Sequence, residues 1–242
     1  MLSSFPADGL AVIIGASGGI GAAVLDQVNR SMAFRQVLGT SRSGSSSSGI
    51  SMQTLDLTDE KTINDFAALI QASGDDLRLV FDATGYLHGE KGGPEKSWSG
   101  IDPDAMAHQF AVNATGPALL MKHLLPLFPR RDKAVFATIS AKVGSIGDNR
   151  LGGWYGYRSA KAALNQLVKT AAIELARKRP DAVCVALHPG TVSTPLSAPF
   201  AKSGLKLQTP QESAASLLSV IDEVTPAQSG QLLSYDGAAL PY

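Results

Sequence analysis

The chain has 242 residues, and its 21 Lys and Arg balance 21 Asp and Glu, so its formal net charge at pH 7 is zero. This balance argues against nucleic acid as the main partner, because phosphate-binding domains usually carry a basic excess. No apolar run approaches the roughly 20 residues that span a bilayer, and no signal peptide is visible. The one cysteine, Cys184, has no partner for an internal disulfide. We therefore expect a globular cytoplasmic protein that binds small molecules.

Short apolar runs alternate with longer helical patterns along the chain. The first run, Leu10–Ile14, is continuous and stops at Gly15, which is typical of a strand buried on both faces. The other predicted strands are Gln36–Thr40, Ser51–Leu55, Leu77–Ala83, Ala134–Ser140, Val183–His188 and Gln231–Tyr235. The predicted helices are Ile20–Arg30, Thr58–Ala72, Asp104–Leu127, Tyr157–Arg179 and Gln211–Val224.

This alternation predicts an α/β fold of the Rossmann type, with a doubly wound sheet of about seven parallel strands and helices on both faces. No composition shift, charged linker or repeat divides the chain, so residues 1–242 are expected to form a single domain. Ligands of such sheets bind beyond the carboxyl ends of the strands. The segments after the strands are therefore where we expect the chemistry.

A glycine-rich segment follows the first strand and reads G-A-S-G-G-I-G from Gly15 to Gly21. Glycines there allow positive φ and close backbone approach, and the N-terminus of the next helix favours an anion. The loop therefore suits a dinucleotide pyrophosphate, although its spacing differs from the common G-x-G-x-x-G fingerprint. A tight turn without a ligand is the alternative. The residues expected to bind the dinucleotide are Gly15, Ser17, Gly18, Gly19, Ile20 and Gly21.

The second predicted strand ends in Thr40-Ser41-Arg42 and has no carboxylate there. A carboxylate at this place would bind the ribose 2′-hydroxyl of NAD, whereas Ser41 and Arg42 suit the 2′-phosphate of NADP. The sequence therefore favours NADP, with NAD as the less favoured cofactor. The alternative is that Arg42 only solvates a loop.

Tyr157 and Lys161 are four residues apart at the start of a predicted helix, so their side chains share one face. A phenol has a pKa near ~10, and a neighbouring ammonium favours its ionised form. The pair is therefore a plausible general acid and base near neutral pH. Y-x-x-x-K alone occurs by chance on many surface helices, and its combination with the glycine loop is what makes the pattern specific.

With this combination the sequence resembles the short-chain dehydrogenase/reductase family, over nearly the whole chain and with the motifs in family order. The glycine loop is similar to the family's T-G-x-x-x-G-x-G motif, with Ile14 in place of Thr, and Tyr157 to Lys161 matches Y-x-x-x-K. The segments Asp148–Gly153 and Ser234–Tyr242 resemble the C-factor-like and carbonyl reductase branch.

The resemblance implies further site residues. Asp56-Leu57 is similar to the pair that contacts adenine, and Asp82 to Gly85 stands where the family has N-N-A-G. Asn113 matches the helix asparagine of the family's N-x-x-G element. Beyond the glycine loop, the implied cofactor-binding residues are Ser41, Arg42, Asp56, Leu57, Ala83, Thr84, Gly85, Tyr157, Lys161, Pro189, Gly190, Thr191 and Val192.

The family's catalytic serine is expected in an S-S-x-x-G segment after the fifth strand. Counting back three residues from Gly144 reaches Ala141, and Ser140 is one residue earlier. Neighbouring side chains in a strand face opposite sides, but a twist at the strand end would bring Ser140 round. Ser140 is therefore the candidate, and Ser145 or a water molecule are alternatives.

The resemblance implies an enzyme that transfers a hydride between the nicotinamide of NADP and a small carbonyl or alcohol substrate. Tyr157 is expected to act as the general acid and base, and Lys161 to lower its pKa and hold the nicotinamide ribose. Asn113 is expected to support a water-linked proton path to Lys161. A serine hydroxyl, or water in its place, is expected to hold the substrate oxygen.

Other functions stay open on the same residues. Ala141 at the serine position suggests a nucleotide-binding sensor or signalling protein with little or no turnover, and epimerisation or dehydration is a third possibility. Family habit favours a homodimer or homotetramer. The four histidines lack metal-ligand spacing, so no metal site is expected.

Overall fold

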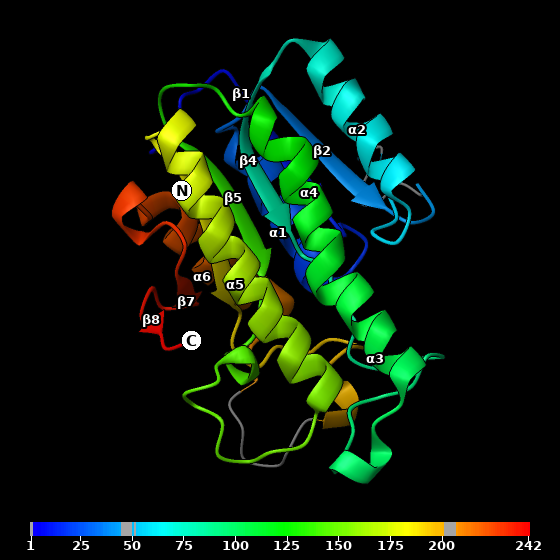
Figure 1. The fold of residues 1–242 in the computed structure, drawn as a ribbon. Helices are drawn as coiled ribbons and strands as arrows, with labels where there is room; N and C mark the ends of the chain where they lie inside the picture. Colours follow the sequence, from blue (N-terminus) through cyan, green and yellow to red (C-terminus); the bar gives the residue numbers. More distant parts are fainter. Residues whose placement is uncertain (1, 45–49, 51, 201–206) are drawn as a thin grey trace.

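The computed structural model describes residues 2–44, 50, 52–200 and 207–242 (Figure 1). Its strands are β1 (Gly9–Ile14), β2 (Gln36–Ser41), β3 (Met52–Thr54), β4 (Asp76–Asp82), β5 (Ala134–Ile139), β6 (Ala182–His188), β7 (Leu232–Ser234) and β8 (Ala239–Leu240). Its α-helices are α1 (Gly19–Ser31), α2 (Glu60–Ser73), α3 (Pro103–Phe110), α4 (Gly116–Leu124), α5 (Tyr155–Lys178) and α6 (Pro210–Glu223). These elements follow the predicted order, and Ser51 of the third predicted strand lies outside the described residues.

The described strands form one sheet in the order β3-β2-β1-β4-β5-β6-β7-β8. Neighbouring strands are parallel from β3 to β7, as predicted, whereas β8 lies antiparallel to β7 at the edge. A strand as short as Ala239–Leu240 has no apolar run that would predict it. The chain leaves β1 toward β2 on one side and returns to β4 on the other, and this reversal is where such sheets bind ligands.

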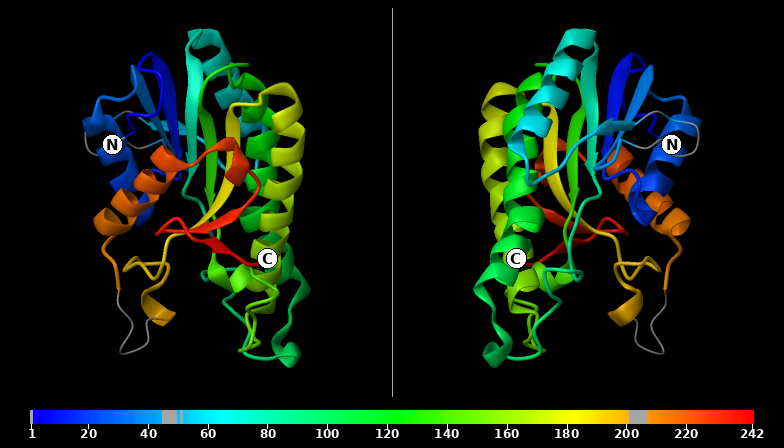
Figure 2. Two further views of the ribbon diagram at one scale, coloured as in Figure 1. Left: turned by 90° about the vertical axis from the view of Figure 1, so that its left-hand side faces the viewer. Right: turned by 90° about the vertical axis from the view of Figure 1, so that its right-hand side faces the viewer.

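Helices cover both faces of the sheet (Figure 2). On one face α1 and α6 bury Val24, Leu25, Leu217 and Ile221 against alternate strand residues. On the other face α2, α4 and α5 bury Ile63, Phe66, Leu120 and Leu164. Because both faces are covered, a central strand must be apolar at every position, and all six residues of β1 are buried.

The segment predicted as one helix, Asp104–Leu127, changes from one helix type to another. α3 and α4 are joined by a π-helical turn, Ala111–Thr115, and a 3-10 turn, Leu125–Leu127, follows α4. The segment is helical along its length, as predicted, although an apolar pattern does not distinguish a π turn from an α turn. Single π turns inside helices are frequent at functional sites, and this one contains Asn113.

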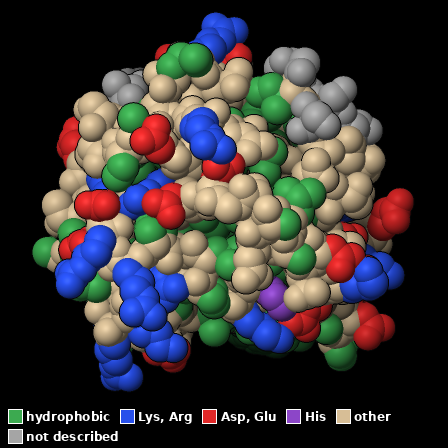
Figure 3. Space-filling model, turned by 90° about the horizontal axis from the view of Figure 1, so that it is seen from above, with side chains coloured by type: hydrophobic (Ala, Val, Ile, Leu, Met, Phe, Trp, Pro, Cys, Tyr) green, Lys and Arg blue, Asp and Glu red, His purple; other side chains and the backbone are tan. Residues whose placement is uncertain are grey.

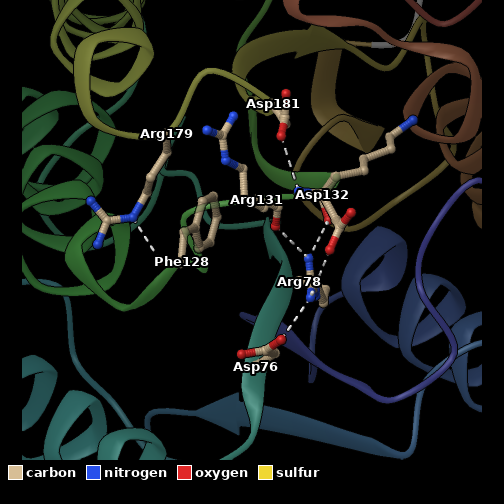
Figure 4. Close-up of polar contacts among 8 residues, drawn as sticks. Asp76, Arg78, Phe128, Arg131, Asp132, Arg179 and Asp181 are labelled. Atoms are coloured by element: carbon tan, nitrogen blue, oxygen red, sulfur yellow. Dashed lines mark hydrogen bonds and ion pairs between the residues drawn. The ribbon is translucent and has the colours of Figure 1, made fainter.

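The edge where the strands begin is closed by polar contacts between loops (Figure 4). Arg78, near the start of β4, is 6% exposed, and its guanidinium lies 2.6 Å from an Asp76 oxygen. It also donates a hydrogen bond to the Arg131 carbonyl at 3.0 Å. Acidic and basic side chains are scattered over the surface of this end (Figure 3). No helix in the described part of the chain has the length and apolar character of a membrane span.

Candidate active site

The glycine loop makes a tight turn between β1 and α1. Gly15 has a φ of +73°, and a Cβ on Gly21 would lie 2.2 Å from the Gly15 carbonyl oxygen. The Ala16 N–H donates to the Thr40 carbonyl at 2.8 Å, which holds the loop against β2. The first turn of α1 has no acidic residue, and no described side chain caps it. The start of α1 therefore remains available for an anion.

The end of β2 carries hydroxyls that are buried without partners. The Oγ of Ser41 and the Oγ1 of Thr40 make no hydrogen bond with any described residue. The side chain of Arg42 is exposed just beyond them. A hydrogen bond from the Thr58 backbone lowers the pKa of Asp56, and the charge of Arg42 lowers it further. Ser41, Arg42 and Asp56 thus lie at one side of the glycine loop, where the sequence predicts the adenosine part of a dinucleotide.

Asp82 stands at the end of β4, where the family pattern has asparagine. It is fully buried, and burial raises the pKa of its carboxyl group. One oxygen accepts from the Thr84 N–H at 3.0 Å and the Thr84 hydroxyl at 2.5 Å, and the other accepts from the Thr138 hydroxyl at 2.7 Å. The Thr84 methyl would lie 3.0 Å from a Cβ on Gly15. Asp82 therefore ties β4 to β5 and supports the glycine loop through Thr84.

Asn113 is fully buried, and its amide is held on both sides. Its Oδ1 accepts from the Tyr86 N–H at 3.0 Å, and its Nδ2 donates to the Tyr86 carbonyl at 2.8 Å and to Gln109 Oε1 at 2.7 Å. Gln109 is not among the residues predicted from the sequence, although its position one helical turn before Asn113 was a usable signal. A Cβ on Gly85 would lie 3.6 Å from Asn113 Oδ1 and 3.9 Å from Lys161 Nζ. Asn113 and Lys161 therefore converge beside Gly85.

Lys161 is buried under the first turns of α5. Its side chain is 1% exposed, and its Nζ donates to the Ile139 carbonyl at 2.7 Å. Burial lowers the pKa of Lys161 to about 8, and the charge of Asp82 opposes this shift. The ammonium lies 5.9 Å from the centroid of the Tyr157 ring.

Tyr157 is half-buried, and its hydroxyl makes no hydrogen bond with the described residues. Burial raises the pKa of Tyr157 to about 12, which differs from the lowered pKa expected from the sequence. Burial of the phenol is the cause of this shift, and Lys161 donates its hydrogen bond to the Ile139 carbonyl. In this structure the phenol is therefore a protonated group with an available hydrogen.

The serine candidates are engaged elsewhere. Ser140 is 1% exposed, and its hydroxyl donates to Asn165 Oδ1 on α5 at 2.7 Å. Ser145 is also buried, and its Oγ accepts from the Asp148 N–H at 3.1 Å. Ala141 is half-buried and lies between β5 and the turn that ends at Gly144. This is the position at which the family pattern has its serine. In this structure the Ser140 hydroxyl is directed toward α5.

The segment after β6 completes the site. Gly190 has a φ of +77°, and a Cβ there would lie 2.7 Å from Gln208 Nε2. Val192 pairs with Gln208, which fixes the base of this segment. A Cβ on Gly19 would lie 2.9 Å from the Thr194 methyl, so the segment reaches the glycine loop. The predicted residues Pro189 to Val192 therefore border the same site as the glycine loop.

Aromatic rings from three loops meet beside Tyr157, and the sequence analysis did not find them. The Trp154 ring lies edge-on to Tyr157 at 6.1 Å and to Phe200 at 5.2 Å, measured between centroids. Phe200 in turn meets His88 at 5.4 Å. These rings give the site an apolar wall next to the phenol. No cluster of metal-ligating side chains occurs among the residues that the structure describes.

Comparison with known proteins gives the family. The family model for short chain dehydrogenase matches residues 9–204. A 1-hydroxy-2-glutathionyl-2-methyl-3-butene dehydrogenase from Rhodococcus sp. strain AD45 is 32% identical over 189 residues, which cover 78% of each chain. The C-signal protein of Myxococcus xanthus is 36% identical over 143 residues, which cover 59% of this chain and 81% of that one.

The fold has a close counterpart among solved structures. The NADPH-bound carbonyl reductase from chicken fatty liver superposes with a TM-score of 0.86 at 23% identity, covering 99% of this chain and 97% of that one. At this identity the likeness concerns the fold. The family match extends over most of the chain and includes the glycine loop, Asn113, Tyr157 and Lys161. The chain therefore belongs to the short-chain dehydrogenase family of oxidoreductases.

Proposed function

We propose that this protein is an NADP-dependent carbonyl reductase in which Tyr157 is the general acid and base. The observation that carries the proposal is the convergence of Asn113 and Lys161 on Gly85, with Lys161 under the Tyr157 ring. The phenol is half-buried, and its hydroxyl makes no hydrogen bond with the described residues. A proton donor next to an apolar wall is what reduction of an uncharged carbonyl requires.

The residues present fit a dinucleotide. The start of α1 is free of acidic side chains, and the glycine at position 21 allows the backbone to turn tightly enough for a pyrophosphate to approach. The buried Ser41 hydroxyl has no hydrogen-bond partner among the described residues, and we expect a ribose phosphate to lie there. Arg42 would bind a 2′-phosphate as a planar cation, which favours NADP over NAD. When bound, NADPH supplies the hydride that reduces the carbonyl carbon.

The chain's own residues would handle the proton and the orientation. With its pKa raised to about 12, Tyr157 holds its proton at neutral pH and donates it to the substrate oxygen. Lys161, with a pKa of about 8, keeps its ammonium at neutral pH and would bind the ribose hydroxyls while favouring the tyrosinate left behind. Asn113 would hold the backbone at Tyr86 and support the path by which the proton is replaced.

Ser140 receives a different role from the one expected. Its hydroxyl is committed to Asn165, so we assign it to the packing beneath α5 rather than to contact with the substrate oxygen. A water molecule would then take the place of the usual serine. Ser145 is no better placed, because its oxygen accepts from the Asp148 backbone.

The test is NADPH oxidation with a panel of aldehydes and ketones. We expect turnover with at least one uncharged carbonyl, and a loss of about a hundredfold or more in kcat in Tyr157→Phe, which keeps the ring but not the proton. Tyr155→Phe is the matched control, because this tyrosine lies in the same turn without a lysine four residues on. A full panel without turnover, or equal rates in Tyr157→Phe, would contradict the proposal.

A second candidate is a nucleotide-binding signalling protein with little turnover. Ala141 at the serine position favours this candidate. The 36% sequence identity to the C-signal protein over 143 residues also favours it. This candidate predicts tight NADPH binding, measured by fluorescence titration, together with no turnover across the panel. Restored or increased turnover in Ala141→Ser would support the reading of a lapsed enzyme.

The remaining expectations stay predictions. Residues 1–242 are proposed to form a single domain, because the described strands share one sheet, and a single calorimetric transition would test this. A homodimer or homotetramer is proposed from family habit, and sedimentation equilibrium would test it. The cytoplasm is the proposed location, which fractionation would test.

A further inference from the structure

α5 carries the catalytic pair, yet it begins without a cap of its own. Its first residue is Tyr155, two residues before Tyr157. The preceding residue, Trp154, has a left-handed φ of 56° and offers no side-chain cap, and the first turn has no acidic residue. The first N–H groups of a helix need acceptors, and an uncapped helix end frays easily. Something outside the helix must therefore fix this turn.

Glu95 supplies the acceptors from a distant loop. Its two carboxylate oxygens lie 3.1 and 3.2 Å from the Gly156 nitrogen and accept its hydrogen. Its backbone carbonyl accepts from the Trp154 N–H at 2.6 Å. Glu95 is half-buried and lies 61 residues before Gly156, between β4 and α3. One residue therefore holds the backbone on both sides of Tyr155.

A side chain at position 156 would crowd this contact. A Cβ there would lie 3.0 Å from Glu95 Oε1 and 3.2 Å from Gln109 Cγ. Gln109 is the residue that binds the amide of Asn113. The start of α5 therefore packs against the Glu95 carboxylate and against Gln109, the residue that binds Asn113.

The same turn reaches the catalytic tyrosine. Glu95 accepts a hydrogen bond from the backbone of Trp154. The ring of Trp154 packs edge-on against the Tyr157 ring. Movement of Trp154 would therefore move the phenol. A shift of one ångström in a reacting group can cost a large factor in rate, even when binding is unchanged.

We propose that Glu95 is a positioning residue that sets the Tyr157 hydroxyl for proton transfer by capping α5 from the loop before α3. The inference rests on the proposed function, since it concerns the proton donor of that reaction. Glu95 lies against the start of α5, whereas NADPH is proposed to bind at the glycine loop. Loss of the cap therefore impairs proton delivery and leaves cofactor binding intact.

The test compares Glu95→Ala and Glu95→Gln with Glu90→Ala, which removes an exposed glutamate of the same loop. In Glu95→Ala we expect kcat to fall about tenfold, with the NADPH Kd within about twofold of the wild type. The solvent deuterium isotope effect on kcat rises, because proton delivery becomes slower. In Glu95→Gln the amide oxygen replaces one of two acceptors, so we expect a loss of about two- to fivefold. Glu90→Ala should match the wild type.

Hydrogen exchange at the Gly156 amide gives a readout that does not depend on turnover. We expect faster exchange in Glu95→Ala than in Glu90→Ala. An unchanged kcat and isotope effect in Glu95→Ala would overturn the inference, as would parallel losses of kcat, NADPH binding and thermal stability, which mark a general folding role. If Glu95→Ala does not fold, an unchanged kcat and isotope effect in Glu95→Gln has the same consequence. A wild type without turnover removes the proposed function and this inference with it, whereas an active wild type with an equally active Glu95→Ala removes the inference alone.

Discussion

The two ends of the sheet satisfy their polar groups in opposite ways. At the end where strands begin, Arg78 is buried, and its two terminal nitrogens contact Asp76 and a backbone carbonyl, whereas its Nε has no partner among the described residues (Figure 4). Lys133 likewise donates to the carbonyls of Asp222 and Val224 at 2.7 and 2.9 Å. These contacts join loops of the same chain, and they leave little for a ligand.

At the end where strands finish, polar groups are left available. Among the described residues, neither the buried Ser41 hydroxyl nor the Tyr157 hydroxyl has a hydrogen-bond partner. Large apolar side chains are exposed in the loops there, and those of Trp98 and Leu151 are 78% and 85% exposed. The difference indicates that the first end serves stability and the second serves binding and chemistry. A substitution at one end of the sheet should therefore change stability with little effect on activity, and one at the other end should change activity or cofactor binding.

The largest effect is expected at Lys161. Lys161→Met removes the ammonium from under Tyr157, and we expect kcat for carbonyl reduction to fall about a hundredfold. In the wild type the rate should fall as pH rises through about 8, because Lys161 loses its proton there. The steady-state rate between pH 6 and 10 measures both. A wild-type fall near pH 8 that persists in Lys161→Met would assign it to another group.

Stability should respond to the same titration with the opposite sign. The pKa of Lys161 is about 8 in the folded chain and 10.5 ordinarily, so the unfolded chain binds more protons between these values. The contribution of Lys161 to stability therefore increases as pH rises from about 8 to 10.5. The unfolding free energy of the wild type should therefore rise relative to that of Lys161→Met over this range, as urea titrations at several pH values would show. A constant difference would mean that Lys161 titrates normally.

The next effect concerns the other end of the sheet. Arg78→Met should reduce the free energy of unfolding by about 2–3 kcal/mol, because it removes hydrogen bonds from a buried charged donor. The kcat of the folded enzyme should stay within about twofold of the wild type. Urea unfolding measures the first quantity and NADPH oxidation the second. The exposed pair Arg30 and Asp26 offers a control, since Arg30→Met should cost less than about 1 kcal/mol.

A smaller effect is expected at the cofactor end of β2. Arg42→Asp should lower the ratio of NADPH to NADH affinity about tenfold, because it exchanges a phosphate-binding cation for an anion that suits a free ribose. Fluorescence titration with both nucleotides gives the ratio. Arg177→Asp, an exposed substitution in the last turn of α5, should leave it unchanged. An unchanged ratio in Arg42→Asp would remove the argument for NADP.

The sequence predicted the features that depend on local pattern. Continuous apolar runs marked the buried strands, and spacing placed Tyr157 and Lys161 on one face of a helix. The missed features depend on contacts between distant segments. α5 begins at Tyr155, where the Gly156 N–H donates to the distant Glu95 carboxylate, and the Asp82 carboxylate accepts from the hydroxyl of Thr138 on another strand. No pattern within either segment records its partner, so these contacts could not be predicted.

The orientation of Ser140 belongs to the same class and gives the smallest effect. Alternation along β5 turns its side chain toward α5, where Asn165 accepts its hydrogen. Ser140→Ala should therefore cost about 1 kcal/mol in unfolding free energy, because a buried acceptor loses its donor. It should change kcat less than about threefold, whereas loss of a donor to a reacting oxygen costs on the order of a hundredfold or more.

Ala141→Ser is the matching change on the neighbouring residue. If the reacting oxygen lies beside position 141, a hydroxyl there should raise kcat. The hydrogen bond from Ser140 to Asn165 should stay as it is in the wild type. Ser140→Ala should thus lower the free energy of unfolding, whereas Ala141→Ser should raise kcat. The two effects would show that neighbouring positions at the end of β5 face opposite sides. A hundredfold loss of kcat in Ser140→Ala with unchanged stability would instead place the Ser140 hydroxyl at the substrate, and would require β5 to twist when the site is filled.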